Sequence, residues 1–131
     1  MPALNHVLVL SDDIDRSRDF YCEAIGVTVG ARPPLPFPGY WLYADGRPCL
    51  HIADRGVYNE TAREMGLGNA VAGAVDHIAF TSGDYDEASA RLVRGGVAAV
   101  PNEVPQAGMR QLFFNGPDGV RIEINVFERE A

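Results

Sequence analysis

Hydrophobic and polar residues alternate along two short stretches of the chain that resemble each other. The first is "LNHVLVL" at 4–10 and the second is "VDHIAF" at 75–80. Alternation among branched and aromatic residues is typical of a β-strand with one buried face. Each stretch places a histidine, His6 or His77, among its apolar residues. The pattern therefore predicts two strands in equivalent settings.

Each of these strands is followed by acidic residues and then by apolar residues at the three-four spacing of an amphipathic helix. The predicted helices cover "DDIDRSRDFYCEAIGV" (12–27) and "GDYDEASARLVRGGV" (83–97), and both end at glycine, a common helix stop. Three shorter strand-like segments follow in each half. They are 27–31, 40–46 and 48–54 in the first half, and 97–100, 110–116 and 119–127 in the second.

The repeat predicts an α+β fold class with two tandem βαβββ modules. The 131 residues suit a single domain, 1–131. We expect module one at about 1–54 and module two at about 75–128. The stretch 55–74 matches nothing in the repeat, so we interpret it as a connection that contains a short helix around 58–65. A loop at 31–40 carries four prolines and is too stiff to form the centre of a strand.

Composition and charge restrict the possible partners. No apolar run approaches the roughly 20 residues that a membrane span needs, and the first residues do not match a signal peptide. The formal net charge of −7 argues against nucleic acid or an anionic membrane as a partner. Two cysteines without a secretion signal favour free thiols and a cytoplasmic location.

The repeat also aligns four polar residues. One shift of the numbering superposes His6 on His77, and nearly the same shift superposes His51 on Glu123. The apolar neighbours of His51 and Glu123 point to the core, so these two side chains point to the other face of their strands. A strand histidine taken alone is more simply a structural residue. The symmetry of all four, however, favours a shared metal site, because imidazole and carboxylate groups are metal ligands.

Three stretches make the chain resemble a known superfamily: "LNHVLVLSDDIDRSRDFYCEAIGV", "VDHIAF" and "FNGPDGVRIEI". They resemble the vicinal oxygen chelate proteins, which include glyoxalase I, methylmalonyl-CoA epimerase, fosfomycin-resistance enzymes, bleomycin-resistance proteins and extradiol dioxygenases. The resemblance implies curved mixed sheets that form a cup around a divalent metal. It also implies a homodimer, with modules paired within or between subunits. His6, His77 and Glu123 match the three metal ligands that dioxygenases and fosfomycin-resistance enzymes share.

The resemblance leaves several reactions open, and they differ in the role of His51. It is similar in position and spacing to the free acid–base histidine of the extradiol dioxygenases, which favours Fe(II) and ring cleavage of a small catechol-like substrate. In glyoxalase I and the epimerase the position is similar to a fourth metal ligand. That alternative implies a lyase or isomerase that uses Zn, Ni, Co or Mn. A third alternative is a non-catalytic protein that only binds, and thereby sequesters, a small molecule.

Six residues are candidates for contact with the substrate. Phe113 takes the place of a tyrosine in the larger extradiol enzymes, so the tyrosine's hydrogen bond is missing or comes from another residue. The proline-rich loop at 31–40 is either a lid or an inert surface loop. The alternative interpretation is ordinary strand packing for the aromatic candidates and an exposed turn for the basic one. The candidates are Phe37, Tyr40, Trp41, Tyr43, Arg110 and Phe113.

Overall fold

The computed structural model describes residues 4–67 and 75–128, and its elements follow the order βαβββ twice. The first module contains β1 (Val7–Ser11), α1 (Ile14–Ala24), β2 (Thr28–Gly30), β3 (Gly39–Ala44) and β4 (Arg47–Asp54). The second contains β5 (His77–Thr81), α3 (Tyr85–Arg94), β6 (Val100–Val104), β7 (Met109–Asn115) and β8 (Arg121–Phe127). Helix α2 (Arg55–Glu64) follows the first module, and the 3₁₀ helix η1 (Pro105–Ala107) joins β6 to β7. The rest of the predicted connection, at 68–74, lies outside the described residues.

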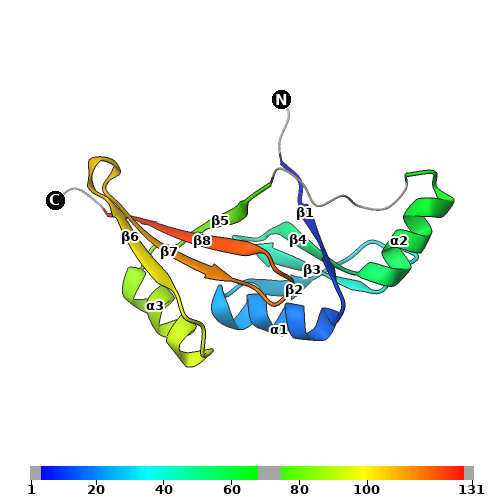
Figure 1. The fold of residues 1–131 in the computed structure, drawn as a ribbon. Helices are drawn as coiled ribbons and strands as arrows, with labels where there is room; N and C mark the ends of the chain where they lie inside the picture. Colours follow the sequence, from blue (N-terminus) through cyan, green and yellow to red (C-terminus); the bar gives the residue numbers. More distant parts are fainter. Residues whose placement is uncertain (1–3, 68–74, 129–131) are drawn as a thin grey trace.

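Each module builds one four-stranded mixed sheet. The strand orders are β1-β4-β3-β2 and β5-β8-β7-β6, and the first pair in each order is parallel while the others are antiparallel. Figure 1 shows the two sheets side by side, with α1 and α3 below them. The predicted α+β class with two βαβββ modules is therefore confirmed. No helix among the described residues is long and apolar enough to cross a membrane.

The two faces of each sheet differ sharply. Leu50 and Ile52 of β4, with Ile122 and Ile124 of β8, are at most 2% exposed and belong to one hydrophobic core that also includes residues of α1 and α3. We call this side of the sheets the helix face. Because side chains alternate along a strand, the residue between Leu50 and Ile52 and the residue between Ile122 and Ile124 point to the opposite side of their sheets. We call this side the open face.

Polar contacts fix the helices against the sheets. Asp13 and Asp84 cap α1 and α3, since their carboxylates accept hydrogen bonds from backbone N–H groups of the first turn. Ser17 of α1 donates a 2.6 Å hydrogen bond to Asp118, in the turn between β7 and β8. Its hydroxyl also lies 2.7 Å from that of Ser11. This buried chain of hydroxyls joins the first module to the second.

Two elements differ from the sequence-based expectation. The segment 97–100 was predicted as a strand, but β6 runs from Val100 to Val104 and includes Pro101, which pairs in register with Leu112. Proline lacks an N–H donor, and it is tolerated here because β6 is the edge strand of its sheet. Helix α2 begins at Arg55, before the expected position, because the Asp54 side chain caps it.

Candidate metal centre

The first module brings His6 and His51 together, and we call these two residues the first pair. His6 lies directly before β1, and β1 pairs with β4, where Leu8 lies opposite His51. The two imidazole centroids are 5.9 Å apart. Trp41 of β3 lies opposite His51 and contacts both rings, at 5.1 Å from His6 and 5.5 Å from His51. All three side chains therefore gather on the open face of the first sheet.

The second module brings His77 and Glu123 together, and we call these two residues the second pair. His77 begins β5, and Ala79 of the same strand lies opposite Glu123 of β8. The Nε2 atom of His77 is 3.7 Å from Oε2 of Glu123. The histidine side chain is 38% exposed and the glutamate side chain 11%. The second pair is thus an imidazole nitrogen and a carboxylate oxygen that face each other at an accessible edge.

The residue before each histidine fixes its tautomer. Nδ1 of His6 is 2.6 Å from Oδ1 of Asn5, and Nδ1 of His77 is 3.0 Å from Oδ2 of Asp76. Each side-chain oxygen accepts a hydrogen bond from Nδ1–H, and in the neutral ring this tautomer leaves the lone pair of Nε2 free, the form that binds a metal. Arg121 donates to the same oxygen of Asp76. The hydrogen bond from His77 and the charge of Arg121 lower the pKa of Asp76.

Two amide side chains hold the carboxylate of Glu123. Gln111 of β7 donates from Nε2 to Oε1 of Glu123 at 2.9 Å, and Asn125 donates to Oε2 at 3.1 Å. Gln111 itself is oriented by Asn102, which donates to its Oε1 at 2.7 Å. Glu123 is only 8% exposed. These bonds supply the compensation that a buried carboxylate requires, and they aim it toward His77.

His51 has the most unusual environment of the four residues. It is 3% exposed, and its Nε2 has no hydrogen-bond partner among the described residues. Burial, followed by the charges of Arg32 and His6, lowers the pKa of His51 to about 4. The imidazole is therefore neutral at physiological pH. A neutral, buried nitrogen without a partner fits either a metal ligand or a proton acceptor.

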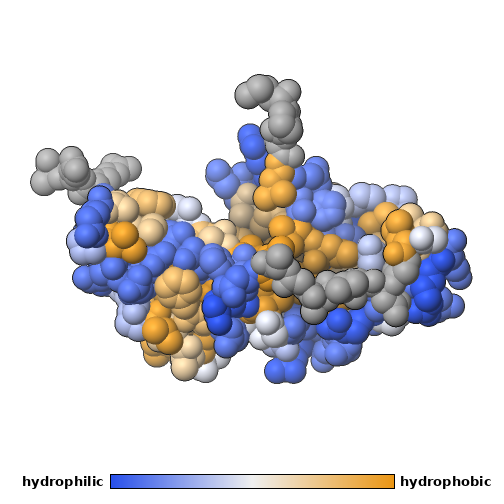
Figure 2. All heavy atoms as spheres, turned by 45° about the horizontal axis from the view of Figure 1, so that its top comes forward, coloured by the Kyte–Doolittle hydropathy of each residue, from blue (hydrophilic) through white to orange (hydrophobic). Residues whose placement is uncertain are grey.

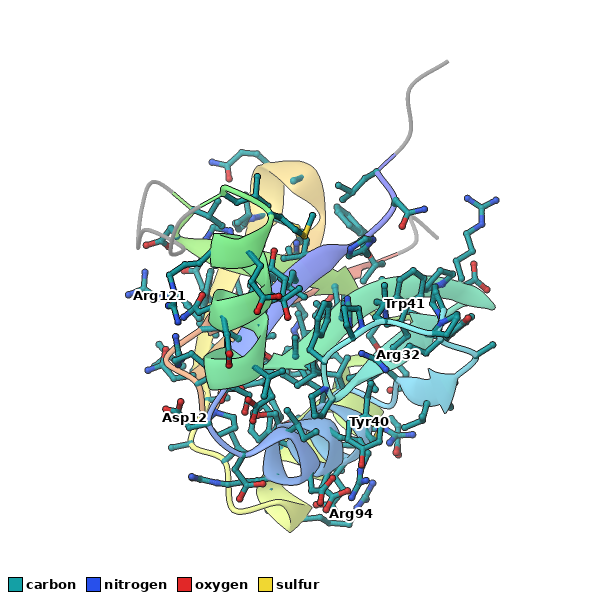
Figure 3. All side chains as sticks on the ribbon, turned by 90° about the vertical axis from the view of Figure 1, so that its right-hand side faces the viewer. Asp12, Arg32, Tyr40, Trp41, Arg94 and Arg121 are labelled. Atoms are coloured by element: carbon teal, nitrogen blue, oxygen red, sulfur yellow. The ribbon has the colours of Figure 1, made fainter. Side chains whose placement is uncertain are left out.

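Within one copy of the chain the two pairs lie apart. In Figure 3, Trp41, the neighbour of His51, is on the opposite side of the view from Arg121, which pairs in register with His77. Among the residues that the structure describes, no group of three His, Cys, Asp or Glu side chains is placed to bind one ion. Each module thus brings together two of the four candidate residues, and the first pair and the second pair do not meet within the described parts of one chain.

The edge strands β1 and β5 lie beside the first pair and the second pair. β1 and β5 each end their sheet, and both line one groove. Leu4 and Val75, which occupy equivalent positions two residues before the histidines, are 87% and 81% exposed. Figure 2 shows hydrophobic surface in the middle of the face that it presents, around the start of β1. Exposed apolar residues next to unpaired strand edges are typical of surfaces that another chain covers.

The candidates for substrate contact divide between the two faces. Phe37 and Trp41 lie against His51, and Phe113 lies opposite Glu123. Tyr40 points to the helix face, where its hydroxyl binds side chains of α1, and Arg110 lies 3.5 Å from the ring centroid of Tyr85 on α3. Tyr43 donates its hydroxyl to the backbone of the proline-rich loop. The structure therefore brings three of the six to the open face beside the pairs.

Several residues that contact the four candidate side chains were not predicted from the sequence. Asn5 and Asp76 stand at equivalent places in the repeat, so their position directly before each histidine was a usable signal for side chains that orient the imidazole rings. Gln111 and Asn102 had no such signal, because their contact with Glu123 depends on the register of β6, β7 and β8. The charge of Arg32 likewise acts on His51 only because of the path of the loop that carries Arg32.

The fold defines a class of protein: two βαβββ modules, here with imidazole and carboxylate side chains on the open faces of their sheets. The family model described as Glyoxalase/Bleomycin resistance protein/Dioxygenase superfamily matches residues 3–124. The chain is 31% identical over 127 residues to the Arabidopsis thaliana protein named Glyoxylase I 4, covering 95% of this chain and 70% of that protein. The chain belongs to this superfamily.

Solved structures show the same fold. Lactoylglutathione lyase from Agrobacterium tumefaciens matches with a TM-score of 0.71 and 17% identity, over 95% of this chain and 92% of that one. TnmS3, an antibiotic-binding protein from Streptomyces, matches with a TM-score of 0.71 and 24% identity, over 98% of both chains. At these identities the likeness extends to the fold and leaves the activity open.

Proposed function

We propose that the chain is a metal-dependent lyase or isomerase that acts on a small carbonyl compound. The observation that carries this proposal is the match between the two pairs. Each presents a histidine whose Nδ1 is held by its preceding residue, facing a second donor from the last strand of the module. A symmetric set of four protein ligands suits a Lewis-acid metal such as Zn, Ni or Co. The 31% identical relative with a glyoxalase name supports the same choice.

The proposed centre is shared by two subunits of a homodimer. His6 and His51 of one copy would meet His77 and Glu123 of the other. Three observations support this arrangement: the separation of the pairs within one chain, the free edges of β1 and β5, and the exposed Leu4. A second copy that paired these edges would cover the apolar residues and complete the donor set at once.

The chain's own residues have distinct tasks in this proposal. The metal, when bound, polarises a carbonyl oxygen of the substrate. His6, His51 and His77 are neutral ligands, and Asn5 and Asp76 keep the first and last of them in the binding tautomer. Glu123 would take a proton from the carbon next to the carbonyl and return it to the neighbouring carbon. The carbon that loses the proton carries a hydroxyl, whose proton passes to the former carbonyl oxygen. One C–H and one O–H bond therefore break and one of each forms, so the step needs no oxidant.

Ring cleavage by an extradiol-type dioxygenase is the second candidate. It is favoured by the aromatic rings around His51 and by the Nε2 atom of that imidazole, which has no hydrogen-bond partner among the described residues and could accept a catechol proton. In that case His6, His77 and Glu123 would hold Fe(II), and His51 would remain free. Phe113, opposite Glu123, offers no hydroxyl to a catechol.

Metal content and turnover distinguish these candidates. The protein is stripped of metal, reloaded separately with Zn, Ni, Co, Mn or Fe(II), and assayed with methylglyoxal plus glutathione and with a catechol in an oxygen electrode. The proposal predicts thioester formation with a non-redox metal and no oxygen uptake. Oxygen uptake and yellow products with Fe(II) alone would support the dioxygenase instead. Saturable metal binding without either reaction would favour sequestration.

Matched variants assign the reaction to the proposed site. Glu123→Gln should abolish turnover, because the amide neither accepts the proton nor binds the metal as a carboxylate does. Glu23→Gln, at an exposed position of α1, is the control and should keep full activity.

A cytoplasmic location belongs to the same proposal. Cys22 and Cys49 are both free, and burial raises the pKa of each thiol. Both side chains are half-buried, a raised thiol pKa lowers reactivity, and free cysteines suit a reducing compartment. Expression with a fluorescent tag, followed by fractionation, would test this assignment.

A further inference from the structure

The proline-rich loop between β2 and β3 is held at both ends. Tyr43 donates a 2.7 Å hydrogen bond to the backbone oxygen of Ala31, at the start of the loop. The backbone N–H of Asp54 donates a 3.0 Å hydrogen bond to the oxygen of Pro38, at its end. Four prolines limit the conformations of the segment between them. The loop therefore presents its side chains to the open face in a restricted way.

Phe37 covers His51. Its ring stacks on the imidazole with centroids 5.5 Å apart and an interplanar angle of 27°. On its other side it meets the edge of Tyr58, from α2, at 5.1 Å and 84°. A flat ring from the loop thus occupies the space beside the most buried residue of the two pairs. We call the space that the Phe37 ring fills next to His51 and Tyr58 the slot.

Arg32 lies beside this slot with a guanidinium that has no acidic partner. Its Nη2 donates to the backbone oxygen of Phe37, and its charge lies 5.5 Å from the centre of that ring. Its Nε is buried without a hydrogen-bond partner, and so is Nε1 of Trp41. No ion pair to Arg32 occurs within the described parts of the chain. Gly30, two residues before Arg32, pairs in register with Trp41, and Figure 3 labels both side chains on the same part of the view.

We propose that Arg32 and Trp41 bind the carboxylate of a planar substrate, whose ring replaces Phe37 on His51. Buried N–H groups without partners are costly, and a carboxylate would satisfy both of them. The net charge of −7 opposes any anionic ligand, so recognition needs a local cation without a partner, and Arg32 is one. Phe37 is then a reversible cover that keeps water from His51 until the substrate arrives. The inference deepens the proposed function, because it names the substrate class of the same site.

Trp41 makes the test direct, because it is the chain's only tryptophan and reports on this site by its fluorescence. Metal-stripped protein is titrated with benzoate and with benzamide, a neutral molecule of the same shape. Benzoate should bind saturably and about tenfold or more tightly than benzamide, as expected for a charged hydrogen-bonded pair. Arg32→Gln should lose this preference, and Arg32→Lys should keep part of it. Arg47→Gln, at an exposed position of β4, should change nothing.

Phe37→Ala tests the cover separately. It removes the ring that the ligand must displace, so benzoate should bind severalfold more tightly than to the native protein. Weaker binding by this variant would overturn the role of Phe37 as a cover. An unchanged preference for benzoate in Arg32→Gln would overturn the carboxylate site, as would a lack of benzoate binding in both the native protein and Phe37→Ala. Because no metal is present, these results do not depend on whether the proposed metal reaction occurs.

Discussion

Replacing Gln111 with leucine tests whether the amide network on the open face prepares Glu123 for metal binding. Gln111 makes three side-chain contacts: it donates to Glu123 at 2.9 Å and to Asn125 at 3.1 Å, and it accepts from Asn102 at 2.7 Å. The variant Gln111→Leu leaves the carboxylate with the bond from Asn125 alone. A hydrogen bond to a charged group contributes about 1.5–3 kcal/mol.

The loss should appear mainly in metal affinity. Removing a residue that hydrogen-bonds to a metal ligand typically weakens metal affinity by about 10- to 100-fold. The free energy of the lost hydrogen bond corresponds to a loss of affinity of the same order. Calorimetric titration of metal-stripped protein with Zn measures this directly. Gln106→Leu, the same substitution at an exposed position of η1, is the control. If Gln111→Leu bound Zn as tightly as the control, Glu123 would not depend on this network, and the reasoning would be refuted.

Three further predictions concern stability. The folded state holds the pKa of His51 at about 4, below the ordinary 6.5. The free energy of unfolding of the metal-free protein should therefore fall by up to about 3 kcal/mol as the pH drops from about 6.5 to about 4, and urea unfolding of His51→Gln should lack that pH dependence. Asp118→Asn weakens the part-buried hydrogen bond from Ser17 of α1 and should lower the free energy of unfolding by about 1–3 kcal/mol, whereas Asp86→Asn, at an exposed position, should change it little. Gly39→Ala would place a methyl group against a backbone oxygen of β4 and should cost about 1–3 kcal/mol, whereas Gly83→Ala meets open space; equal melting temperatures for these two variants would contradict the packing described.

The elements that the sequence predicted well are those whose signals are local. Alternation in "VDHIAF" and the three-four spacing after it are properties of a few neighbouring residues, and they predict β5 and α3. β6 was misplaced because its tolerance of Pro101 depends on lying at the edge of a sheet, which is a property of the assembled fold. Asp54 belongs to the residue types that commonly cap helices, so its position was a usable signal for the start of α2.

The candidate site, too, could be predicted only where its signals are local. The repeat predicts which strands carry His51 and Glu123, and the alternation of strand side chains predicts their face. It does not predict whether the two modules meet within one chain or between two, because both arrangements satisfy the same internal symmetry. The contacts of Gln111 and Arg32 depend on strand register and on the path of a loop, which no local pattern encodes.

The most direct test of the account is metal binding by a mixture of two defective variants. His6→Ala disrupts the first pair and Glu123→Ala disrupts the second, so each variant alone should bind little metal. If the centre is shared between subunits, a mixed dimer contains one site with both defects and one intact site. Unfolding and refolding an equal mixture should therefore restore about a quarter of the native metal content per chain, since about half of the dimers are mixed. A mixture that binds no more metal than the separate variants would contradict a centre built from two copies of the chain.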